Sequence, residues 1–413
     1  MKHFNLKSPL IPLCLLILID HIGYGILFPI LVPLFMGSEG ILVPETTEFA
    51  RSIWYNVILT IFPITLFFGS TLLGGFSDQF GRKRILIFCL LAAILSYFLT
   101  GIAIDLKNIP LLMFSRVLAG LAAGSMPIAQ AAIIDISEEK EKAANLSLVI
   151  LAASVGFLLG PLIGGFFSNS NIVGWFGYST PFYIASLLAF LNLCFLVFFF
   201  KETFVPRNAK PFNLAQCLEY YTAPFFMKNI RYLSLICLFI QLGWSLYFQF
   251  VSVFLLKRFE FNSQDISFFM TLMGIGFAIG SCFGLRFFSK FVNDVKLALL
   301  SLIVIDLCVL SVAIELHSVA IWVASLLLGI TMSMVYSLTI KFFSEVVSEE
   351  QQGWIMGVTE AIIAVAWAAT PLASAYLEKM SISLPLMVAT ILFIVSTFML
   401  GGWKNTMKNE RSI

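Results

Sequence analysis

The sequence predicts an all-α integral membrane protein with twelve transmembrane helices in two six-helix bundles. Of its 413 residues, 60% are hydrophobic and only 12% are charged. A mean hydropathy of +0.97 excludes an ordinary soluble domain. The apolar residues form long runs separated by short polar stretches, and the cations are distributed unevenly among those stretches. These observations together predict a protein that spans the membrane many times.

The apolar runs set the expected helices. Most contain 20 to 27 residues, enough to cross a hydrocarbon core of ~30 Å at about 1.5 Å per residue. The expected spans are 10–35, 52–76, 85–104, 110–134, 145–167, 180–200, 230–256, 265–288, 297–316, 319–343, 352–377 and 384–402.

The distribution of Lys and Arg predicts the orientation. With both termini in the cytoplasm, 19 of the 25 cations lie on the cytoplasmic side, five lie outside, and Arg116 lies within a span. Such an excess is typical of cytoplasmic loops. The first apolar run is too long for a cleaved signal peptide, contains Asp20 and lacks a small-x-small site, so we expect it to be a permanent span.

Polar residues divide the chain into halves. We expect an N-terminal bundle over 1–200, a cytoplasmic linker over 201–229 and a C-terminal bundle over 230–413. Within the linker, 212–226 is either a short interfacial helix or a disordered tether. The outer loop 37–52 is expected to be a solvated connector.

The segment Gly74-Gly75-Phe76-Ser77-Asp78-Gln79-Phe80-Gly81-Arg82-Lys83-Arg84 is too charged to lie in lipid. It resembles G-x-L-a-D-r-x-G-R-K-R, the loop between the second and third helices of major facilitator superfamily transporters, with Phe76 in place of Leu. The resemblance implies the major facilitator fold and a cytoplasmic latch that opens during transport. The implied gating residues are Gly74, Asp78, Gly81, Arg82 and Asp135.

In that family the acid of this loop, here Asp78, faces the start of the eleventh helix, which in this chain is a capping box at 348–351. The basic residue four positions later, here Arg82, contacts an acid of the fourth helix. The resemblance therefore implies a contact between Arg82 and Asp135. The alternative is a static set of charge pairs that only fixes topology. In the second half, Phe288 stands where the acid belongs, so we expect no second latch.

The fifth span reproduces the G-x-x-x-G-P-x-x-G-G pattern of antiporter members. Close approach of a neighbouring helix at its glycines, together with a bend at its proline, implies a hinge. The expected partner is the stripe Gly276, Gly280 and Gly284 of the eighth span, and the alternative is helix packing alone. The hinge residues are Gly156, Gly160, Pro161, Gly164 and Gly165.

Four charged residues stand out near mid-membrane, where each charge costs about 2.5–3.5 kcal/mol on insertion scales; they are Asp20, Arg116, Asp306 and Glu360. Asp20, about 15 Å from the inner surface at 1.5 Å per residue, begins D-x-x-G-x-G-x-x-x-P-x-x-x-P. This resembles the first helix of tetracycline–proton antiporters, with Val32 at the final Leu. The resemblance implies that Asp20 carries the proton, and the alternative is a satisfied structural pair. Asp306 aligns with an acid of the ninth helix there. Asp306 and Glu360 are further candidates for proton coupling. The alternative is that they form hydrogen bonds between helices.

Arg116 belongs to an R-x-x-x-G pattern of the fourth helix and either pairs with Asp20 or binds substrate. Gln249 and Tyr336, near aromatic residues of the seventh and tenth spans, are further substrate-binding candidates; lipid contact or core packing is their alternative. The acid of the third helix in tetracycline pumps aligns with Ser96, which argues against a metal-chelated tetracycline as substrate.

The sequence thus predicts a proton-coupled antiporter of alternating access that exports a small organic solute or drug across a bacterial inner membrane. The same fold could instead take up or release a siderophore or other nutrient, and a transport-inactive sensor or scaffold is a second alternative. We find no phosphate-binding loop, nucleophile triad or metal-ligand cluster, so we expect no enzyme activity, cofactor or metal. The expected partners are a small-molecule substrate, protons and the lipid bilayer, with no nucleic acid, and a monomer is expected.

Overall fold

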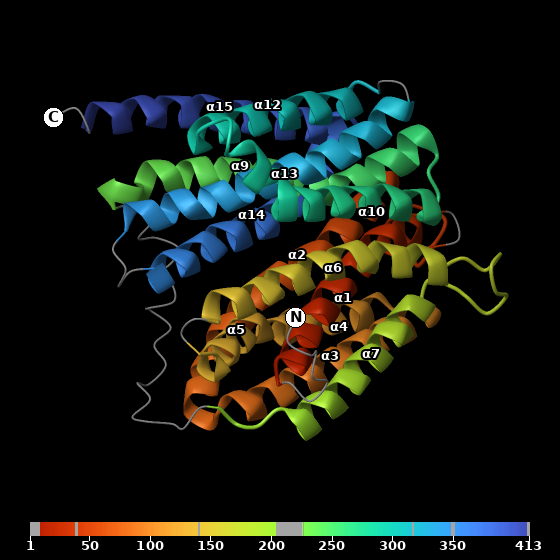
Figure 1. Cartoon of the computed structure of the whole chain (residues 1–413). Helices are drawn as coiled ribbons and strands as arrows, with labels where there is room; N and C mark the ends of the chain where they lie inside the picture. The colour runs from red at the N-terminus through yellow and green to blue at the C-terminus, as the bar shows by residue number, and fades with distance from the viewer. Residues whose placement is uncertain are drawn as a thin grey trace. The chain divides into compact units, whose positions relative to one another are not determined.

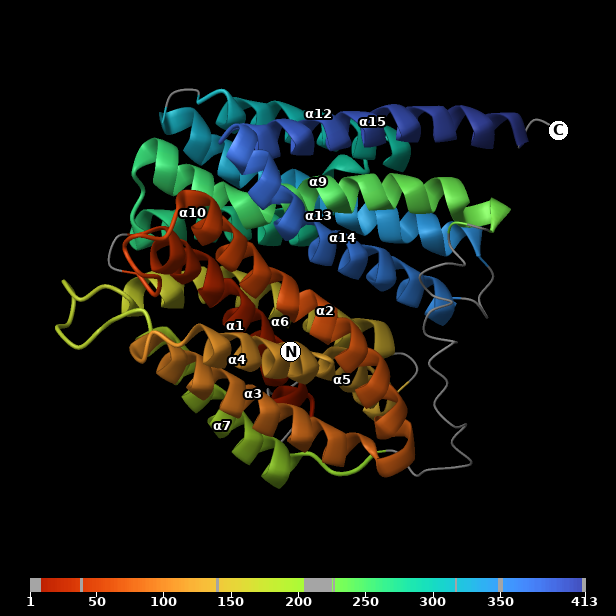
Figure 2. The same cartoon turned by 180° about the vertical axis from the view of Figure 1, so that it is seen from behind.

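The computed structural model describes residues 9–37, 40–138, 141–203, 225, 227–315, 318–347 and 352–410. The capping box at 348–351 lies outside these residues, as does almost all of the linker segment 212–226. Eleven helices are long and apolar enough to cross a membrane, and a shorter apolar helix covers Leu151–Phe167. The predicted all-α, multi-pass membrane fold is confirmed (Figures 1 and 2).

The chain forms two compact units, Met1–Phe212 with Phe261–Thr271, and Asn213–Glu260 with Leu272–Ile413. The helices of the first unit are α1 (Leu10–Met36), α2 (Glu48–Phe80), α3 (Arg82–Asp105), α4 (Ile109–Ala123), α5 (Ser125–Ile136), α6 (Lys142–Phe167) and α7 (Thr180–Phe199). After them come α9 (Lys228–Phe259), α10 (Ser263–Ile279), η1 (Gly280–Gly284), α11 (Leu285–Phe288), α12 (Asp294–Ala313), α13 (Ser318–Val346), α14 (Gln352–Met380) and α15 (Leu384–Glu410). The start of α10 groups with the first unit, and the rest of it with the second.

In the first unit, α1 is the central helix and packs along α6, while α3 packs against α4 and α7 (Figure 1). Leu13, Leu16 and Ile17 of α1 are buried in a core that includes Leu86 and Ile128. A helix that is apolar on all sides can be buried completely, and this explains how α1 occupies the middle of its bundle.

In the second unit, α9 packs against α14 and α15, and α12 packs against α13 and α15. The apolar stretch of α9 is 83% buried, against 39% for that of α15. Peripheral helices such as α15 expose large apolar side chains, including Phe398 and Ile391. In a membrane protein these side chains face lipid.

The glycines of α6 approach α1. A Cβ added to Gly160 would lie 2.7 Å from the carbonyl oxygen of Ile22 and 2.8 Å from Cα of Gly25. Gly156 and Gly164 also face α1. A glycine stripe allows close packing but does not specify the neighbouring helix, so the sequence could not identify this partner.

The glycines of the eighth span instead approach α13, where a Cβ at Gly276 would meet Leu326 and one at Gly280 would meet Ile330 and Ser333. The predicted packing of the two glycine stripes against each other is therefore wrong. Gly165 alone faces the start of α10, because its Cβ would collide with the side chain of Ser267.

The fourth span, predicted as one helix over 110–134, is broken into α4 and α5 at Gly124. The backbone at Gly124 lies against Gly69 and Ser70 of α2, so closely that a Cβ would be 2.5 Å from the Gly69 carbonyl carbon. The break places Ser125 at the start of a new helix, and its side chain then faces α1.

The loop between α1 and α2, predicted to be a solvated connector, is held by hydrogen bonds to a buried arginine. Arg51, only 7% exposed, donates five hydrogen bonds of 3.0–3.2 Å to backbone carbonyls. The acceptors are Phe35, Gly37, Val43, Pro44 and Thr46. Since Phe35 belongs to the last turn of α1, Arg51 provides a cation at that helix end, where the dipole favours positive charge.

Candidate functional site

Asp20 lies half-buried in the middle of α1, and its carboxylate accepts a hydrogen bond from Ser125 at the start of α5. The distance from Ser125 Oγ to Asp20 Oδ2 is 2.7 Å. No cation lies within ion-pair distance of this carboxylate among the described residues. A carboxylate supported by one hydroxyl and no cation pays a high desolvation cost when charged, and protonation removes that cost.

Tyr97 of α3 lies between Asp20 and Arg116 and interacts electrostatically with both. Its hydroxyl donates a long hydrogen bond of 3.4 Å to the carbonyl of Ile19. Gly23 makes this position possible, because a Cβ there would lie 2.0 Å from the Tyr97 oxygen. The glycine of the first-helix pattern therefore admits an aromatic side chain next to the buried acid.

Arg116 of α4 is 1% exposed and is held by neutral groups. Its Nη2 donates to Thr100 Oγ1 at 2.5 Å, and its guanidinium lies 5.8 Å from the centre of the Phe182 ring. Its Nε has no hydrogen-bond partner among the described residues. The pairing with Asp20, one of the two predicted alternatives, does not occur in this structure.

Ser96, which replaces an acid of the tetracycline pumps, packs beside the arginine site. Its hydroxyl donates to the carbonyl of Ser115 at 2.9 Å, and Thr100 bridges to the Ser115 hydroxyl at 2.9 Å. The third and fourth spans are thus joined by neutral hydrogen bonds at the position where the pumps have a charge.

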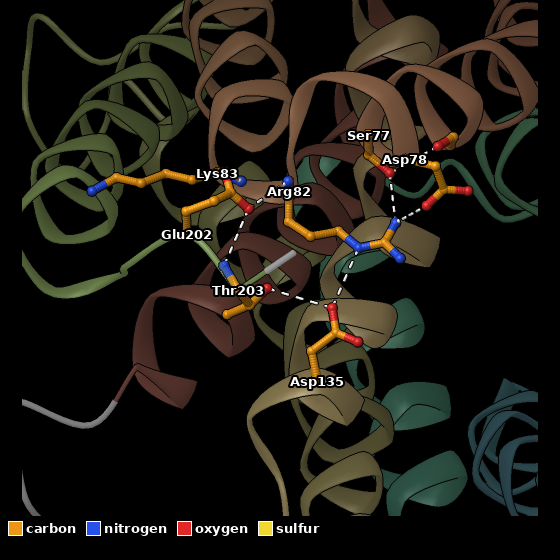
Figure 3. Close-up of polar contacts among 8 residues, drawn as sticks. Ser77, Asp78, Arg82, Lys83, Asp135, Glu202 and Thr203 are labelled. Atoms are coloured by element: carbon orange, nitrogen blue, oxygen red, sulfur yellow. Dashed lines mark hydrogen bonds and ion pairs between the residues drawn. The ribbon is translucent and has the colours of Figure 1, made fainter. Parts of the chain in front are cut away.

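A second charged site lies at the turn between α2 and α3 (Figure 3). Arg82 Nη1 is 2.7 Å from Asp78 Oδ1, and Arg82 Nε is 3.5 Å from Asp135 Oδ2. The same Nη1 donates to Ser77 Oγ at 2.7 Å. The predicted contact between Arg82 and Asp135 is confirmed, while the pairing of Asp78 with Arg82 was not predicted. We call Ser77, Asp78, Arg82, Lys83, Asp135, Glu202 and Thr203 the turn cluster.

Sequence reasoning missed Glu202, which follows α7. Its two carboxylate oxygens accept hydrogen bonds from the backbone N–H groups of Arg82 at 2.8 Å and Lys83 at 3.1 Å. Thr203 Oγ1 lies 3.4 Å from Asp135 Oδ2 (Figure 3). A Glu-Thr pair directly after an apolar run was the available signal, but its partner lies about 120 residues away in the chain.

The two glycines predicted at the gate differ in their surroundings. Gly81 has φ +97° and ψ 151°, a conformation that other residues rarely adopt, and it both ends α2 and precedes α3. At Gly74 a Cβ would meet nothing within 4 Å among the described atoms. Of these two glycines, Gly81 is the one whose backbone conformation requires glycine.

In the second unit the candidate residues do not form one set. Asp306 of α12 hydrogen-bonds with Thr397 of α15, and Ile303 and Leu307 of the same helix are exposed. Glu360 of α14 is exposed and makes no hydrogen bond or ion pair among the described residues, but it interacts electrostatically with Tyr336 of α13. The two acids therefore face different neighbours.

Gln249 of α9 is 2% exposed, and its amide donates to Ser245 Oγ at 2.5 Å and to Thr370 Oγ1 at 3.2 Å. This joins α9 to α14. Among the described residues, no three His, Cys, Asp or Glu side chains gather in a way that could hold a metal ion.

The comparison with known families decides the class of protein. A model of the Major Facilitator Superfamily matches residues 13–371. The chain belongs to this family.

Multidrug resistance protein 2 of Bacillus subtilis is 27% identical over 62% of this chain and 63% of that protein. The class H tetracycline resistance protein of Pasteurella multocida is 25% identical over 65% of this chain and 64% of that protein. These matches span less than two thirds of either relative. Multidrug resistance protein 1 of Bacillus subtilis is 25% identical over 88% of this chain and 92% of that protein.

Solved structures agree in fold. A mutant of the nucleoside transporter NupG superposes with a TM-score of 0.76 at 12% identity, covering 96% of this chain and 99% of that chain. The D-xylose–proton symporter gives 0.74 at 13% identity, covering 95% and 97%. At these identities the likeness concerns the fold alone.

Proposed function

We propose that this protein is a proton-coupled antiporter that exports a small organic solute across a bacterial inner membrane, with both termini in the cytoplasm. The observation that carries the proposal is the placement of Asp20: an acid in the middle of α1, bonded to Ser125 at a helix break and without a cation partner among the described residues. The drug-resistance names of the relatives support export.

In the proposed cycle, Asp20 binds a proton from the outside and releases it to the cytoplasm. The Ser125 hydroxyl can donate to the ionised carboxylate, and Tyr97 interacts electrostatically with both Asp20 and Arg116. Binding of solute near Arg116 changes the field on Asp20, which couples solute to proton. Such coupling needs only that solute and proton stabilise different states.

In the second unit we propose that Glu360 and Tyr336 contact the solute, because Glu360 is exposed and Tyr336 is half-buried beside it. Asp306, which is bonded to Thr397, is better suited to joining α12 with α15. Gln249 is buried and doubly hydrogen-bonded, which favours a role in packing α9 against α14.

The turn cluster is proposed to be the cytoplasmic latch, and α6 the hinge. Ion pairs of Arg82 with Asp78 and Asp135 can break and re-form as the chain alternates between states. The close contact between the glycines of α6 and the backbone of α1 would let these helices slide together as one body, with Pro161 bending α6.

The experiment uses inside-out vesicles energised to acidify their interior, with a fluorescent reporter of the pH gradient. Tetracycline, a quinolone and ethidium are added in turn, with vesicles of Asp20→Asn as the matched control. At least one solute should dissipate part of the gradient in wild type and none in the variant. Solute accumulation without proton movement would rule out proton antiport, and proton-driven accumulation in right-side-out vesicles would show uptake instead.

A further inference from the structure

Glu202 and Thr203, which follow α7, contact two other parts of the turn cluster. Glu202 contacts the start of α3, and Thr203 contacts Asp135. We propose that Glu202 is a positioning residue of the latch: it holds the start of α3 in place and couples the first residues of the linker to the Arg82–Asp135 pair. The inference rests on the latch proposed above. It is carried by the contacts of Glu202, Thr203 and Gly81 (Figure 3).

Glu202 supplies the cap that α3 lacks. The first N–H groups of a helix have no intrahelical partner, and Gly81, the residue before α3, offers no side chain to accept from them. The carboxylate of Glu202 accepts from the first two, those of Arg82 and Lys83. A negative charge at this end is also stabilised by the helix dipole. The orientation of Arg82 therefore depends on a residue from the end of the bundle.

Gly81 is shaped to admit this carboxylate. A Cβ at Gly81 would lie 2.5 Å from Oε2 and 2.8 Å from Cδ of Glu202. Glycine is thus required twice at this position, once for its positive φ and once because Glu202 occupies the space of a side chain. The motif glycine and the acid after α7 form one structural unit.

Thr203 extends the contact to the acid of the latch. Its hydroxyl lies 3.4 Å from Asp135 Oδ2, the oxygen that also faces Arg82 Nε at 3.5 Å. Lys83 adds a third contact, donating from Nζ to the carbonyl of Val197 at 2.9 Å. Because Glu202 and Thr203 are neighbours among the first residues of the linker, a displacement of this segment would pull on both the α3 cap and the Arg82–Asp135 pair.

The test measures two quantities in the full chain, without solute or proton gradient. Hydrogen exchange measures how well the backbone amides at the start of α3 are protected. Maleimide labelling of Met356→Cys, in a cysteine-free background, measures how accessible α14 is from the cytoplasmic side. Glu202→Gln and Glu202→Ala should speed exchange at Arg82 and Lys83 and raise labelling about two- to tenfold, the range of a weakened charged cap. The control is Lys201→Gln, a substitution at the exposed residue next to Glu202. It should change neither the exchange rate nor the labelling.

A double substitution separates positioning from general stability. In Gly81→Ala the added methyl already displaces the Glu202 carboxylate, so Glu202→Ala should add almost nothing to the labelling of Gly81→Ala. Independent roles would instead multiply the two effects. Multiplied effects, or faster exchange with unchanged labelling in Glu202→Gln, would overturn the proposal. Neither readout requires transport, so failure of the proton-antiport proposal would leave this result interpretable.

Discussion

The α2–α3 turn of the first unit and the α11–α12 connection of the second occupy equivalent positions in the two halves of the sequence but are built differently. The first is a network of charges in which Arg82 contacts two acids and Glu202 caps the next helix. The second exposes three phenylalanines, the first of which has ring contacts with the other two, and it has no acid at the corresponding place. These are Phe287, Phe288 and Phe291, accompanied by exposed Arg286 and Lys290.

The acids inside the helices differ in the same way. Asp20 belongs to a set of residues drawn from α1, α3, α4 and α5, in which each side chain contacts the next or interacts with it electrostatically. Asp306 and Glu360 each stand in separate surroundings. This difference is the basis for proposing that the first unit carries both the proton site and the latch, and that the second unit mainly shapes the solute site. The following predictions test this division.

The largest effect is expected at the buried acids. Asp20→Asn should reduce gradient-driven solute accumulation in proteoliposomes to background, because an amide accepts the Ser125 hydrogen bond but cannot bind and release a proton. Solute exchange without a gradient should persist, since it needs no proton. Asp306→Asn is the matched substitution in the second unit and should retain most of the accumulation.

Wild-type-like accumulation by Asp20→Asn would remove Asp20 as the coupling residue. A loss of accumulation in Asp306→Asn with folding intact would place part of the proton site in the second unit and break the comparison.

The glycine contacts should come next in size. Gly160→Leu places a side chain against the backbone of Ile22 and Gly25, and Gly280→Leu places one against Ile330, so both should lower the temperature of unfolding in detergent. Overpacking typically costs about 1–3 kcal/mol, and rigid backbone neighbours favour the upper end. Gly174→Leu, where a Cβ would meet nothing within 4 Å among described atoms, is the control. Equal stability of Gly160→Leu and the control would contradict the α1–α6 contact.

The sequence was sufficient for features set by composition or by local spacing. Apolar runs predicted the spans, and the resemblance to a known loop predicted the Arg82–Asp135 contact. The break at Gly124 had a local signal in Pro127, the third residue of α5, but a single apolar run concealed it. Helix breaks in membrane proteins depend on the groups that satisfy the freed backbone, and these come from other helices.

Features set by partners distant in sequence could not be predicted. Arg51 looked like an ordinary loop cation because its acceptors are backbone carbonyls, which every residue has. Glu202 looked like the beginning of a polar linker. The stripe of α6 could have met any helix, since small residues permit contact without choosing it. In each case the type of residue indicated that a contact could form, but the sequence did not show which residue lies next to it in the folded protein.

At the turn cluster the expected effect is intermediate. Asp78→Asn removes an ion pair of Arg82, and Arg82→Ala removes its contacts with Asp78 and Asp135, so both should favour the state with the cytoplasmic side open. An exposed ion pair contributes about 0.2–1 kcal/mol, which corresponds to a shift of up to about fivefold at 1.4 kcal/mol per tenfold. Labelling of Met356→Cys from the cytoplasmic side measures the shift. Unchanged or reduced labelling in Asp78→Asn would mean that the turn only fixes topology.

The smallest effect is expected at the corresponding position of the second unit. Phe288→Asp places an acid where Asp78 stands in the first unit, but the residue four positions later is Val292, where the first unit has Arg82. The new carboxylate therefore gains no equivalent ion pair, and labelling of Met356→Cys should stay within about twofold of wild type, the effect of a solvent-exposed charge. Phe288→Ala serves as the control for loss of the ring contact with Phe287, 5.2 Å between centroids. If Phe288→Asp lowered labelling several-fold while Phe288→Ala did not, an acid alone would be enough to form a latch, and the contrast between the two turns would rest on one residue rather than on a network.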